Sequence, residues 1–321
     1  MRSRWHGRIF CACFRAIRDN RKMGEKINRL GVVAFKRDER VADLARELRD
    51  WARLNDVELL WHSSTSHGAP RDCKPVTDSV LLRKAEAVLS IGGDGTLLSA
   101  ARLVNGKPIP LLGLNYGRLG FLADLPSNDE LVSLTRVVQG MHLIEERTVL
   151  EATVFRGRKA VHRDRCLNEF FLRGKRELSM IEIEVANSSG TVCDYWADGL
   201  LVATPTGSTA YSLALGGPIV EQSVPCVILT PVAPHSLNVR PLVLSDEGTF
   251  ILKPRVRESA LLLSDGRNEF HLHPGDEVKV VKSKHPVLLV RPHDATFSDA
   301  LRQKLGWSAA VGLQSHGKPC R

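Results

Sequence analysis

The stretch Ile91-Gly92-Gly93-Asp94-Gly95-Thr96 decides the fold of this chain, because of what lies on either side of it. Residues 85–90 before it, Ala-Glu-Ala-Val-Leu-Ser, are apolar enough to predict a buried strand. Residues 97–104 after it, Leu-Leu-Ser-Ala-Ala-Arg-Leu-Val, predict a helix. Three glycines and one carboxylate are therefore expected at a strand-to-helix turn.

This turn has the composition of a phosphate-binding loop. Glycines let backbone N–H groups approach a phosphate, and a helix N-terminus favours negative charge. Asp94 would repel a phosphate, so its presence in such a loop indicates a function, such as holding a metal ion or taking a proton from an attacking hydroxyl. An ordinary tight turn is the alternative, since Asp-Gly pairs are common in turns. The chain has no GxxxxGK[ST] or GxGxxG pattern, so this loop is its candidate nucleotide site.

The segments around the loop alternate between strand and helix patterns. Strands are predicted at 31–35, 57–61, 85–91 and 110–114, and helical spacing at 40–54 and 80–83. This alternation predicts an α/β N-terminal domain, residues 27–145, with a Rossmann-like open parallel sheet. The loop would then lie at the carboxyl end of a strand, where such sheets bind ligands.

After about residue 145 the pattern changes to short strands separated by turns. They are predicted at 148–155, 167–172, 180–185, 199–204, 225–230, 249–253, 260–263, 278–281 and 287–290, with one helix from Ser208 to Gly216. Residues 131–140 are expected to cross between the domains. The sequence therefore predicts a β-rich C-terminal domain, residues 146–300, followed by a segment, 301–321, that returns to the N-terminal domain and ends in a tail.

Positive charge is concentrated at the N-terminus. The net charge is +9, yet residues 1–22 hold seven basic residues and one acidic residue, which leaves +3 for the other 299. Aromatic residues are only 6%, so a basic nucleic-acid-binding protein is disfavoured. Residues 1–26 are expected to be a disordered basic extension, as a transit peptide or as translated sequence upstream of a true start at Met23. No apolar run approaches the ~20 residues that span a bilayer.

The cysteines and histidines show no metal-site spacing. Seven cysteines are scattered without a CxxC pair, which predicts reduced thiols in a cytoplasmic protein. His271 and His273 are two apart on a predicted strand, but no third ligand is near them in the sequence. No metal ligands are therefore predicted.

Three further stretches are rich in polar side chains. The stretch 196–212, WADGLLVATPTGSTAYS, places four hydroxyls within six residues at a helix start. Capping needs only one hydroxyl, so the excess suits a polar, planar ligand, with Tyr211 stacking on a base or lying in the core. Asn168-Glu169 suits a purine edge and ribose hydroxyls, or is a plain strand-end turn. In 234–241, PHSLNVRP, a structural His235 is favoured over a catalytic one.

Together these motifs resemble the bacterial NAD kinase family. The resemblance covers roughly residues 28–310 and includes, in the family's order, GGDGT at 92–96, GLNYGRLGFL at 113–122, Asn168-Glu169, the block 198–219, the block 234–241, Asp265-Gly266 and KLGW at 304–307. It implies a diacylglycerol-kinase-like or phosphofructokinase-like α/β domain for phosphate chemistry and a β-rich domain for NAD recognition. It also implies transfer of the γ-phosphoryl of ATP to the 2′-hydroxyl of the adenosine ribose of NAD, with Mg²⁺ or another divalent cation, in a cytoplasmic homo-oligomer (dimer or tetramer).

The resemblance assigns roles to particular residues. Asp94 is expected to accept the proton of the hydroxyl, and Arg102 to offset phosphate charge. Arg267 and Trp196 depart from residues that many members carry. The residues expected to bind substrates are Gly92, Gly93, Asp94, Gly95, Thr96, Asn168, Glu169, Ser179, Trp196, Asp198, Thr209, Ala210, Tyr211, Ser212, Leu213, Ala214 and Arg267.

Two other functions remain open from the residues alone. Diacylglycerol, sphingosine and phosphofructo-kinases share GGDG, so a lipid kinase is one alternative, although it leaves the block 196–219 unexplained. A non-catalytic nucleotide sensor on the same fold is the other, although Asp94 and Asn168-Glu169 are intact.

Overall fold

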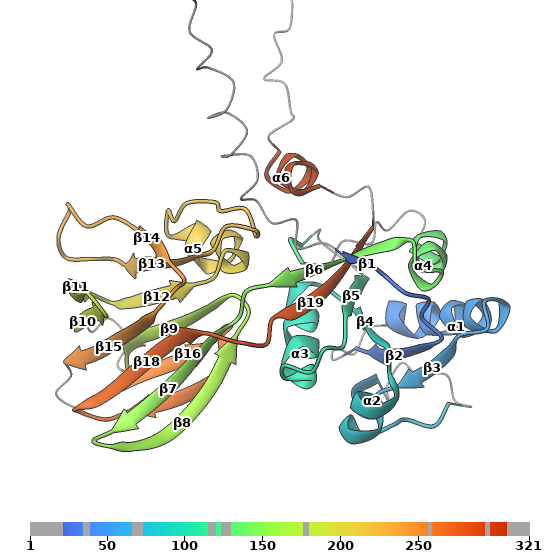
Figure 1. The fold of residues 1–321 in the computed structure, drawn as a ribbon, viewed down its shortest axis with the longest axis horizontal. Helices are drawn as coiled ribbons and strands as arrows, with labels where there is room; N and C mark the ends of the chain where they lie inside the picture. Colours follow the sequence, from blue (N-terminus) through green and yellow to red (C-terminus); the bar gives the residue numbers. More distant parts are fainter. Residues whose placement is uncertain are drawn as a thin grey trace, which may run out of the picture. The chain divides into compact units, whose positions relative to one another are not determined.

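The computed structural model describes residues 22–34, 39–65, 73–114, 120–122, 130–175, 180–255, 259–292 and 296–306. The chain forms two compact units (Figure 1). The α/β unit comprises residues 23–97, 111–143 and those from 290 onward, and the β-rich unit comprises 98–110 and 144–289. The boundaries fall inside strands β6 (His142–Arg147) and β19 (Val287–Pro292) and inside helix α3 (Asp94–Val104).

In the described residues, a seven-stranded sheet runs in the order β1-β6-β19-β5-β4-β2-β3. Neighbours among β2, β3, β4 and β5 pair in parallel, as expected for strands joined by helical crossovers. The predicted open parallel sheet is therefore confirmed. Apart from β6 and β19, the strands of this sheet are β1 (Lys22–Met23), β2 (Arg29–Val33), β3 (Glu58–Trp61), β4 (Ala87–Ile91) and β5 (Leu111–Leu114).

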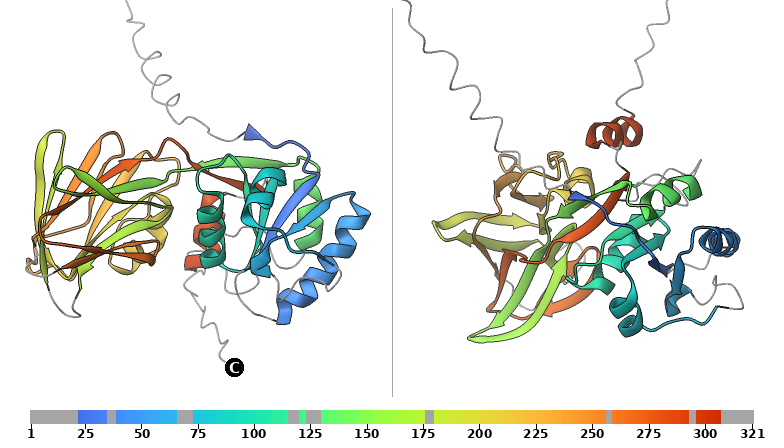
Figure 2. Two further views of the ribbon diagram at one scale, coloured as in Figure 1. Left: turned by 90° about the horizontal axis from the view of Figure 1, so that it is seen from below. Right: turned by 45° about the vertical axis from the view of Figure 1, so that its right-hand side comes forward.

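Helices pack on both faces of the parallel strands (Figure 2). Leu30 and Val32 of β2 belong to one buried cluster with α1 (Glu39–Leu54) and α4 (Glu130–Val138). Gly31 points the other way, because a side chain added there would lie 3.2 Å from Leu81 of α2 (Asp78–Lys84). A short 3₁₀ helix, Ser63–Thr65, and a last helix, α6 (Phe297–Leu305), complete the described elements of this unit.

Residues 22–26 belong to the fold, although the sequence predicts them as part of a disordered extension. Lys22–Met23 form the edge strand β1, and the Gly24 N–H donates to the His142 carbonyl at 2.9 Å. Backbone hydrogen bonds of this kind need no apolar pattern, so the sequence carries little sign of them. Residues 1–21 lie outside the described part of the chain.

The β-rich unit contains two antiparallel sheets, each of six strands among the described residues. The first, in the order β11-β10-β15-β18-β7-β8, comprises Gly190–Ala197, Ile181–Asn187, Thr249–Arg255, Asp276–Lys282, Leu150–Arg156 and Lys159–Cys166. The second, in the order β14-β13-β12-β9-β16-β17, comprises Leu242–Ser245, Cys226–Val232, Gly199–Ala203, Glu169–Gly174, Ala260–Ser264 and Arg267–Leu272.

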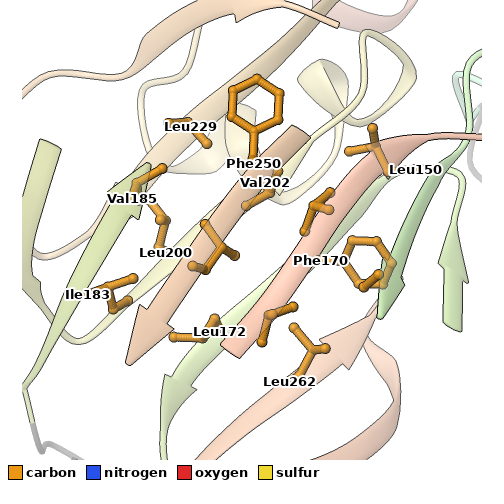
Figure 3. Packing of buried hydrophobic residues seen from close by; sticks show 14 of the residues in the cluster. Leu150, Phe170, Leu172, Ile183, Val185, Leu200, Val202, Leu229, Phe250 and Leu262 are labelled. Atoms are coloured by element: carbon orange, nitrogen blue, oxygen red, sulfur yellow. The ribbon is translucent and has the colours of Figure 1, made fainter. Parts of the chain in front are cut away.

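One apolar core joins the two sheets. Along β10, Ile183 and Val185 are buried while Glu184 between them is partly exposed, as expected for a strand with one face toward a core. Figure 3 shows their side chains in one layer with those of the second sheet, such as Leu200 and Val202. The unit is therefore a sandwich of aligned faces, and its loops are held by a rigid scaffold.

Candidate active site

The predicted phosphate loop connects β4 to α3. Gly92 has φ 144, a conformation open to glycine, and a side chain there would lie 2.4 Å from the buried Thr96 hydroxyl. The Thr96 N–H donates to the Gly93 carbonyl at 2.9 Å and closes the first turn. A Cβ added to Gly93 would meet nothing within 4 Å. The loop therefore presents backbone with open space beside it at the start of a helix.

Asp94 lies at the first residue of α3, and its carboxylate is held by backbone groups of residues 120–122. Oδ2 accepts the Phe121 N–H at 2.8 Å, and Oδ1 accepts the Leu122 N–H at 3.1 Å. A Cβ at Gly120 would lie 1.9 Å from Oδ1, so only glycine lets this segment come so close. These two hydrogen bonds fix the orientation of the carboxylate, a group that accepts hydrogen bonds and protons.

In the β-rich unit, a two-residue turn joins β16 to β17. Its residues, Asp265 and Gly266, have φ of 49 and 67, which is the pattern of a type I′ hairpin. The Asp265 side chain is 2% exposed, and its carboxylate accepts three backbone N–H groups. The donors and distances are Leu167 at 3.2 Å, Asn168 at 2.7 Å and Glu169 at 3.3 Å. The turn thus fixes the backbone of the predicted Asn168-Glu169 pair.

Arg102 serves the same turn, although the sequence suggests that it offsets phosphate charge. Its Nη2 donates to the Ser264 carbonyl at 2.5 Å and lies 3.8 Å from Asp265 Oδ2. The pKa of Asp265 is raised, because the effect of burial exceeds that of the backbone hydrogen bonds and the Arg102 charge, which lower it. A buried carboxylate needs such partners, which explains why the Arg102 guanidinium lies beside Asp265. Arg267 of β17 donates to the Ser99 hydroxyl at 2.9 Å.

Asn168 and Glu169 are both buried, at 8% and 6% exposure. Burial, and then the negative charge of Asp265, raise the pKa of Glu169 to about 8. Its Oε2 is buried and has no hydrogen-bond partner. A buried polar atom without a partner is uncommon and calls for an explanation, of which a missing ligand is one. The protonated carboxyl could donate a hydrogen bond as well as accept one.

The hydroxyls of the block 196–212 hold its own loop. Thr204 Oγ1 donates to the Leu167 carbonyl at 2.6 Å and accepts the Gly207 N–H at 3.1 Å. Ser208 Oγ donates to the Pro205 carbonyl at 2.6 Å. Neither the 3₁₀ helix Thr206–Thr209 nor the helix α5 (Tyr211–Ala214) has a side-chain cap. The excess of hydroxyls thus has a third explanation: they attach this loop to the bend at Leu167 and Asn168, between β8 and β9.

Two glycines and a serine complete the fastening. A Cβ on Gly207 would lie 2.2 Å from the Asn168 carbonyl oxygen, and one on Gly217 would lie 2.2 Å from the Ser212 hydroxyl. Ser212 in turn shares a hydrogen bond of 2.8 Å with Thr230. The predicted binding residue Ser212 is therefore fully buried, and only its neighbours in α5 face outward.

The remaining predicted residues include exposed aromatic groups. Tyr211 is 44% exposed and meets Phe171 edge-on at 5.7 Å, so it is not a core residue. Trp196 is 55% exposed and stacks on His235 at 4.3 Å. Thr209, Ala210, Leu213 and Asp198 are half-buried, and Ala214 and Arg267 are exposed. Ser179 lies outside the described residues.

A cavity of about 210 Å³ lies in the β-rich unit beside the Asp265 turn. Its polar lining includes Arg102, Asp164, Arg165 and Asp265, and Cys166 also borders it. Burial raises the pKa of the Cys166 thiol well above its usual value, so the thiol stays protonated and unreactive. Among the described residues, no group of three His, Cys, Asp or Glu side chains could hold a metal ion.

Sequence reasoning missed four contributors to this geometry: Gly120, the backbone of Phe121 and Leu122, Asp265 as an anchor, and the contact of Arg102 with it. The Asp265-Gly266 pair between two apolar runs was a signal for a hairpin turn. The reach of its carboxylate to residues 167–169, however, depends on the pairing of β16 with β9, which local sequence does not encode.

Comparisons with known proteins agree on one family. The model of the ATP-NAD kinase N-terminal domain matches residues 30–142, and that of the ATP-NAD kinase C-terminal domain matches residues 167–292. The NAD kinase of Pseudomonas fluorescens (strain Pf-5) is 33% identical over 291 residues, covering 90% of this chain and 98% of that protein. The NAD kinase of Thiobacillus denitrificans is 37% identical over 227 residues, covering 71% and 78%.

Two solved structures share the fold. The yeast NADH kinase complexed with NADH superposes with a TM-score of 0.81 at 22% identity, covering 90% of each chain. An NAD kinase from Archaeoglobus fulgidus in complex with ATP has a TM-score of 0.68 at 24% identity, covering 87% of this chain and 97% of that one. The fold and the matched domains thus define a kinase. The chain belongs to the NAD kinase family. No helix in the described residues is long and apolar enough to cross a membrane.

Proposed function

We propose that the protein transfers the γ-phosphoryl group of ATP to the 2′-hydroxyl of the adenosine ribose of NAD, which yields NADP and ADP. The observation that carries the proposal is the Gly92–Thr96 loop, with an oriented carboxylate and open backbone at a helix start, in a chain whose two halves match both NAD kinase domains. A plain tight turn has no need of a carboxylate held in this way.

In this proposal Asp94 accepts the proton of the ribose hydroxyl. The Phe121 and Leu122 N–H groups orient its carboxylate toward the incoming proton. A positioned general base contributes about 10²–10⁴-fold to a rate. The 2′-hydroxyl becomes the nucleophile as its proton leaves, and the γ-phosphorus–oxygen bond to ADP breaks as the new ester bond forms.

The backbone around the carboxylate is suited to hold phosphates. The backbone of Gly93 and Gly95 lies at the N-terminus of α3, where the helix dipole favours negative charge. The Gly92 and Thr96 N–H groups donate to the Leu114 and Gly93 carbonyls and so fix the shape of the loop. We expect a divalent cation to arrive with ATP, because Mg²⁺ is commonly bound through substrate phosphates and keeps several of its waters. The cation would neutralise charge that develops on the transferred group.

NAD recognition is assigned to the β-rich unit. The buried Glu169 Oε2 lacks a partner, and a ribose hydroxyl would supply one. Asn168 offers an amide for an adenine edge from the same anchored turn. The other proposed contacts are Ser179, Trp196, Asp198, Thr209, Ala210, Tyr211, Ser212, Leu213, Ala214 and Arg267. The exposure of Trp196 and Tyr211 supports stacking on a flat ring.

Two further parts of the proposal concern assembly and location. We expect a homodimer or homotetramer without nucleic-acid or membrane partners. Exposed apolar side chains on the edge strand β14, Leu242 and Val243, and on the preceding loop, Leu237, support association through this edge.

Free thiols at Cys73, Cys166, Cys193 and Cys226 support the cytoplasm as the compartment.

The test is direct. The purified protein is incubated with ATP, Mg²⁺ and NAD, and NADP is measured with an NADP-specific dehydrogenase. Parallel reactions offer diacylglycerol or sphingosine as the acceptor. NADP formation that depends on both ATP and NAD supports the proposal. A protein that is folded yet makes no NADP, or that phosphorylates a lipid instead, overturns it, and binding of both nucleotides without turnover would indicate a sensor.

A further inference from the structure

Helix α6 places a charged side chain on its packed face. Ala300 is 9% exposed, and Lys304 follows it by one turn, on the same face of the helix. Lys304 is half-buried and its ammonium nitrogen is buried, whereas Arg302 on another face is exposed. Removing an ammonium group from water costs free energy, so a lysine at this position depends on favourable contacts with its neighbours.

The Lys304 ammonium lies over an aromatic ring that belongs to the segment around Asp94. Its Nζ is 4.8 Å from the centre of the Phe121 ring, within the range of about 6 Å for a cation–π contact. The backbone N–H of the same Phe121 donates to Asp94 Oδ2 at 2.8 Å. The side chain of Phe121 thus faces the lysine while its backbone holds the carboxylate, and all three residues belong to the α/β unit.

The three residues of the described segment 120–122 differ in how they are attached. Gly120 has no side chain, because a Cβ there would collide with the Asp94 carboxylate. Leu122 is buried, at 5% exposure, and anchors one end. Phe121 is half-buried, so the lysine above its ring supplies contact that the apolar core does not. The position of the Phe121 N–H therefore depends on what holds the ring.

We propose that Lys304 is a positioning residue for phosphoryl transfer. By holding the Phe121 ring, it keeps the Phe121 and Leu122 N–H groups on the Asp94 carboxylate and so keeps the carboxylate aimed. The proposal rests on the proposed function of Asp94 as proton acceptor. A carboxylate that turns away by a fraction of an ångström loses rate while nucleotide binding is kept, because its effect is confined to the transition state.

The first experiment compares three variants of the full-length protein. Lys304→Met keeps the chain length and removes the charge, and Lys304→Arg keeps a cation for the ring. Arg302→Met also removes a cation, together with its ion pair to Asp299, on the exposed face of α6. We expect Lys304→Met to lower kcat about tenfold, the size of a partly desolvated cation–π contact, with little change in KM for NAD. Lys304→Arg should recover most of the rate, and Arg302→Met should match the wild type.

The same variants distinguish a positioning role from a structural one. In a Phe121→Leu background the ring is gone, so Lys304→Met should cost little further rate. A kcat for Lys304→Met close to the wild type, a Lys304→Arg variant as slow as Lys304→Met, or full additivity with Phe121→Leu would each overturn the proposal.

A second readout does not depend on catalysis. Amide hydrogen exchange of Phe121 and Leu122 in the nucleotide-free protein reports directly on their hydrogen bonds to Asp94. Lys304→Met should exchange these amides about tenfold faster, with Arg302→Met unchanged. If the wild type made no NADP, the proposed function would fail, yet this measurement would still test the contact. Unchanged exchange, or faster exchange with an unchanged kcat, refutes the positioning role.

Discussion

The Asp265 carboxylate accepts the Asn168 N–H at 2.7 Å, from a hairpin turn 97 residues further along the chain. The same carboxylate also takes the Leu167 and Glu169 N–H groups and lies near Arg102. Both backbone N–H groups of the proposed NAD-binding pair, and that of Leu167 before it, therefore depend on one buried side chain. Its position in the fold makes Asp265 an anchor of this part of the site.

Asp265→Asn should therefore weaken both stability and NAD binding. An amide keeps one acceptor oxygen but turns a donor NH₂ toward backbone N–H groups, and each group left without a partner costs about 1–3 kcal/mol. We expect a lower melting temperature and an NAD KM raised several-fold or more, measured by thermal denaturation and steady-state kinetics. Glu247→Gln, which neutralises an exposed carboxylate of the same unit, is the control. Equal behaviour of the two variants would contradict the anchoring role.

Glu169 should make the stability of the β-rich unit depend on pH. Its folded pKa of about 8 lies above the ordinary 4.5, so the folded state holds the proton more tightly than the unfolded chain. The resulting stabilisation is complete below about pH 4.5 and is lost as the pH rises through about 8.

Comparison with Glu169→Gln isolates this effect. The difference in melting temperature between wild type and variant should change by several degrees between pH 5 and pH 9, in the sense that the wild type loses more at high pH. Asp265, whose pKa burial also raises, is present in both proteins. A difference that stays constant across this range would show that Glu169 titrates normally.

The fold was readable where strands are buried on both faces or alternate clearly. The strands β2, β4, β5 and β12 are wholly or almost wholly buried, and the apolar runs predicted them. By contrast, the pattern missed β8, β11 and β14, which are the edges of their sheets. An edge strand exposes much of its surface, so Lys159–Cys166 carries the residues KAVHRDRC without a usable alternation.

The candidate site was readable as a set of motifs but not as a set of contacts. Local sequence predicted that Gly92–Thr96 forms a turn between strand and helix, because glycine and the flanking apolar runs are local signals. It could not predict that Phe121 and Leu122 hold Asp94, or that Asp265 holds Asn168, because these bonds join residues 27 to 97 positions apart. Such contacts are set by tertiary pairing.

Asp94→Asn should abolish or severely reduce NADP formation. The amide cannot take up a proton at neutral pH, so we expect kcat to fall about 10²-fold or more. The amide would also leave the Phe121 or Leu122 N–H facing an NH₂ group, which predicts a small fall in melting temperature with the fold retained. Steady-state NADP assays and circular dichroism measure both. Turnover close to that of the wild type would remove Asp94 from the mechanism.

Asn168→Ala should weaken the interaction with NAD and spare that with ATP. Loss of a buried polar partner of a ligand costs about 1–3 kcal/mol, which is roughly a 5-fold to 150-fold rise in the NAD dissociation constant. The Asn168 N–H and carbonyl stay in place, since they belong to the backbone. Titration of each nucleotide separately measures the effect, with Asn187→Ala at the end of β10 as the control. A change confined to ATP would contradict the assignment.

The last prediction is that residues 1–22 are dispensable. They carry a net charge of +6 from seven basic residues and one acidic residue, and they have no long periodic pattern that would bury a face. A shortened protein that begins at Met23 loses Lys22, but it keeps the Gly24 hydrogen bond to His142 and the Ile27 hydrogen bond to Val138, which tie the start of the fold to its sheet and to α4. It should fold, melt within a few degrees of the full-length chain and phosphorylate NAD at a similar rate.

A second truncation, beginning at Asn28, removes those two bonds and should melt lower, because the Val138 and His142 carbonyls lose their partners. If the first truncation were already unstable, or slow at low salt and normal at high salt, the basic segment would be packing on the body or attracting anionic substrates.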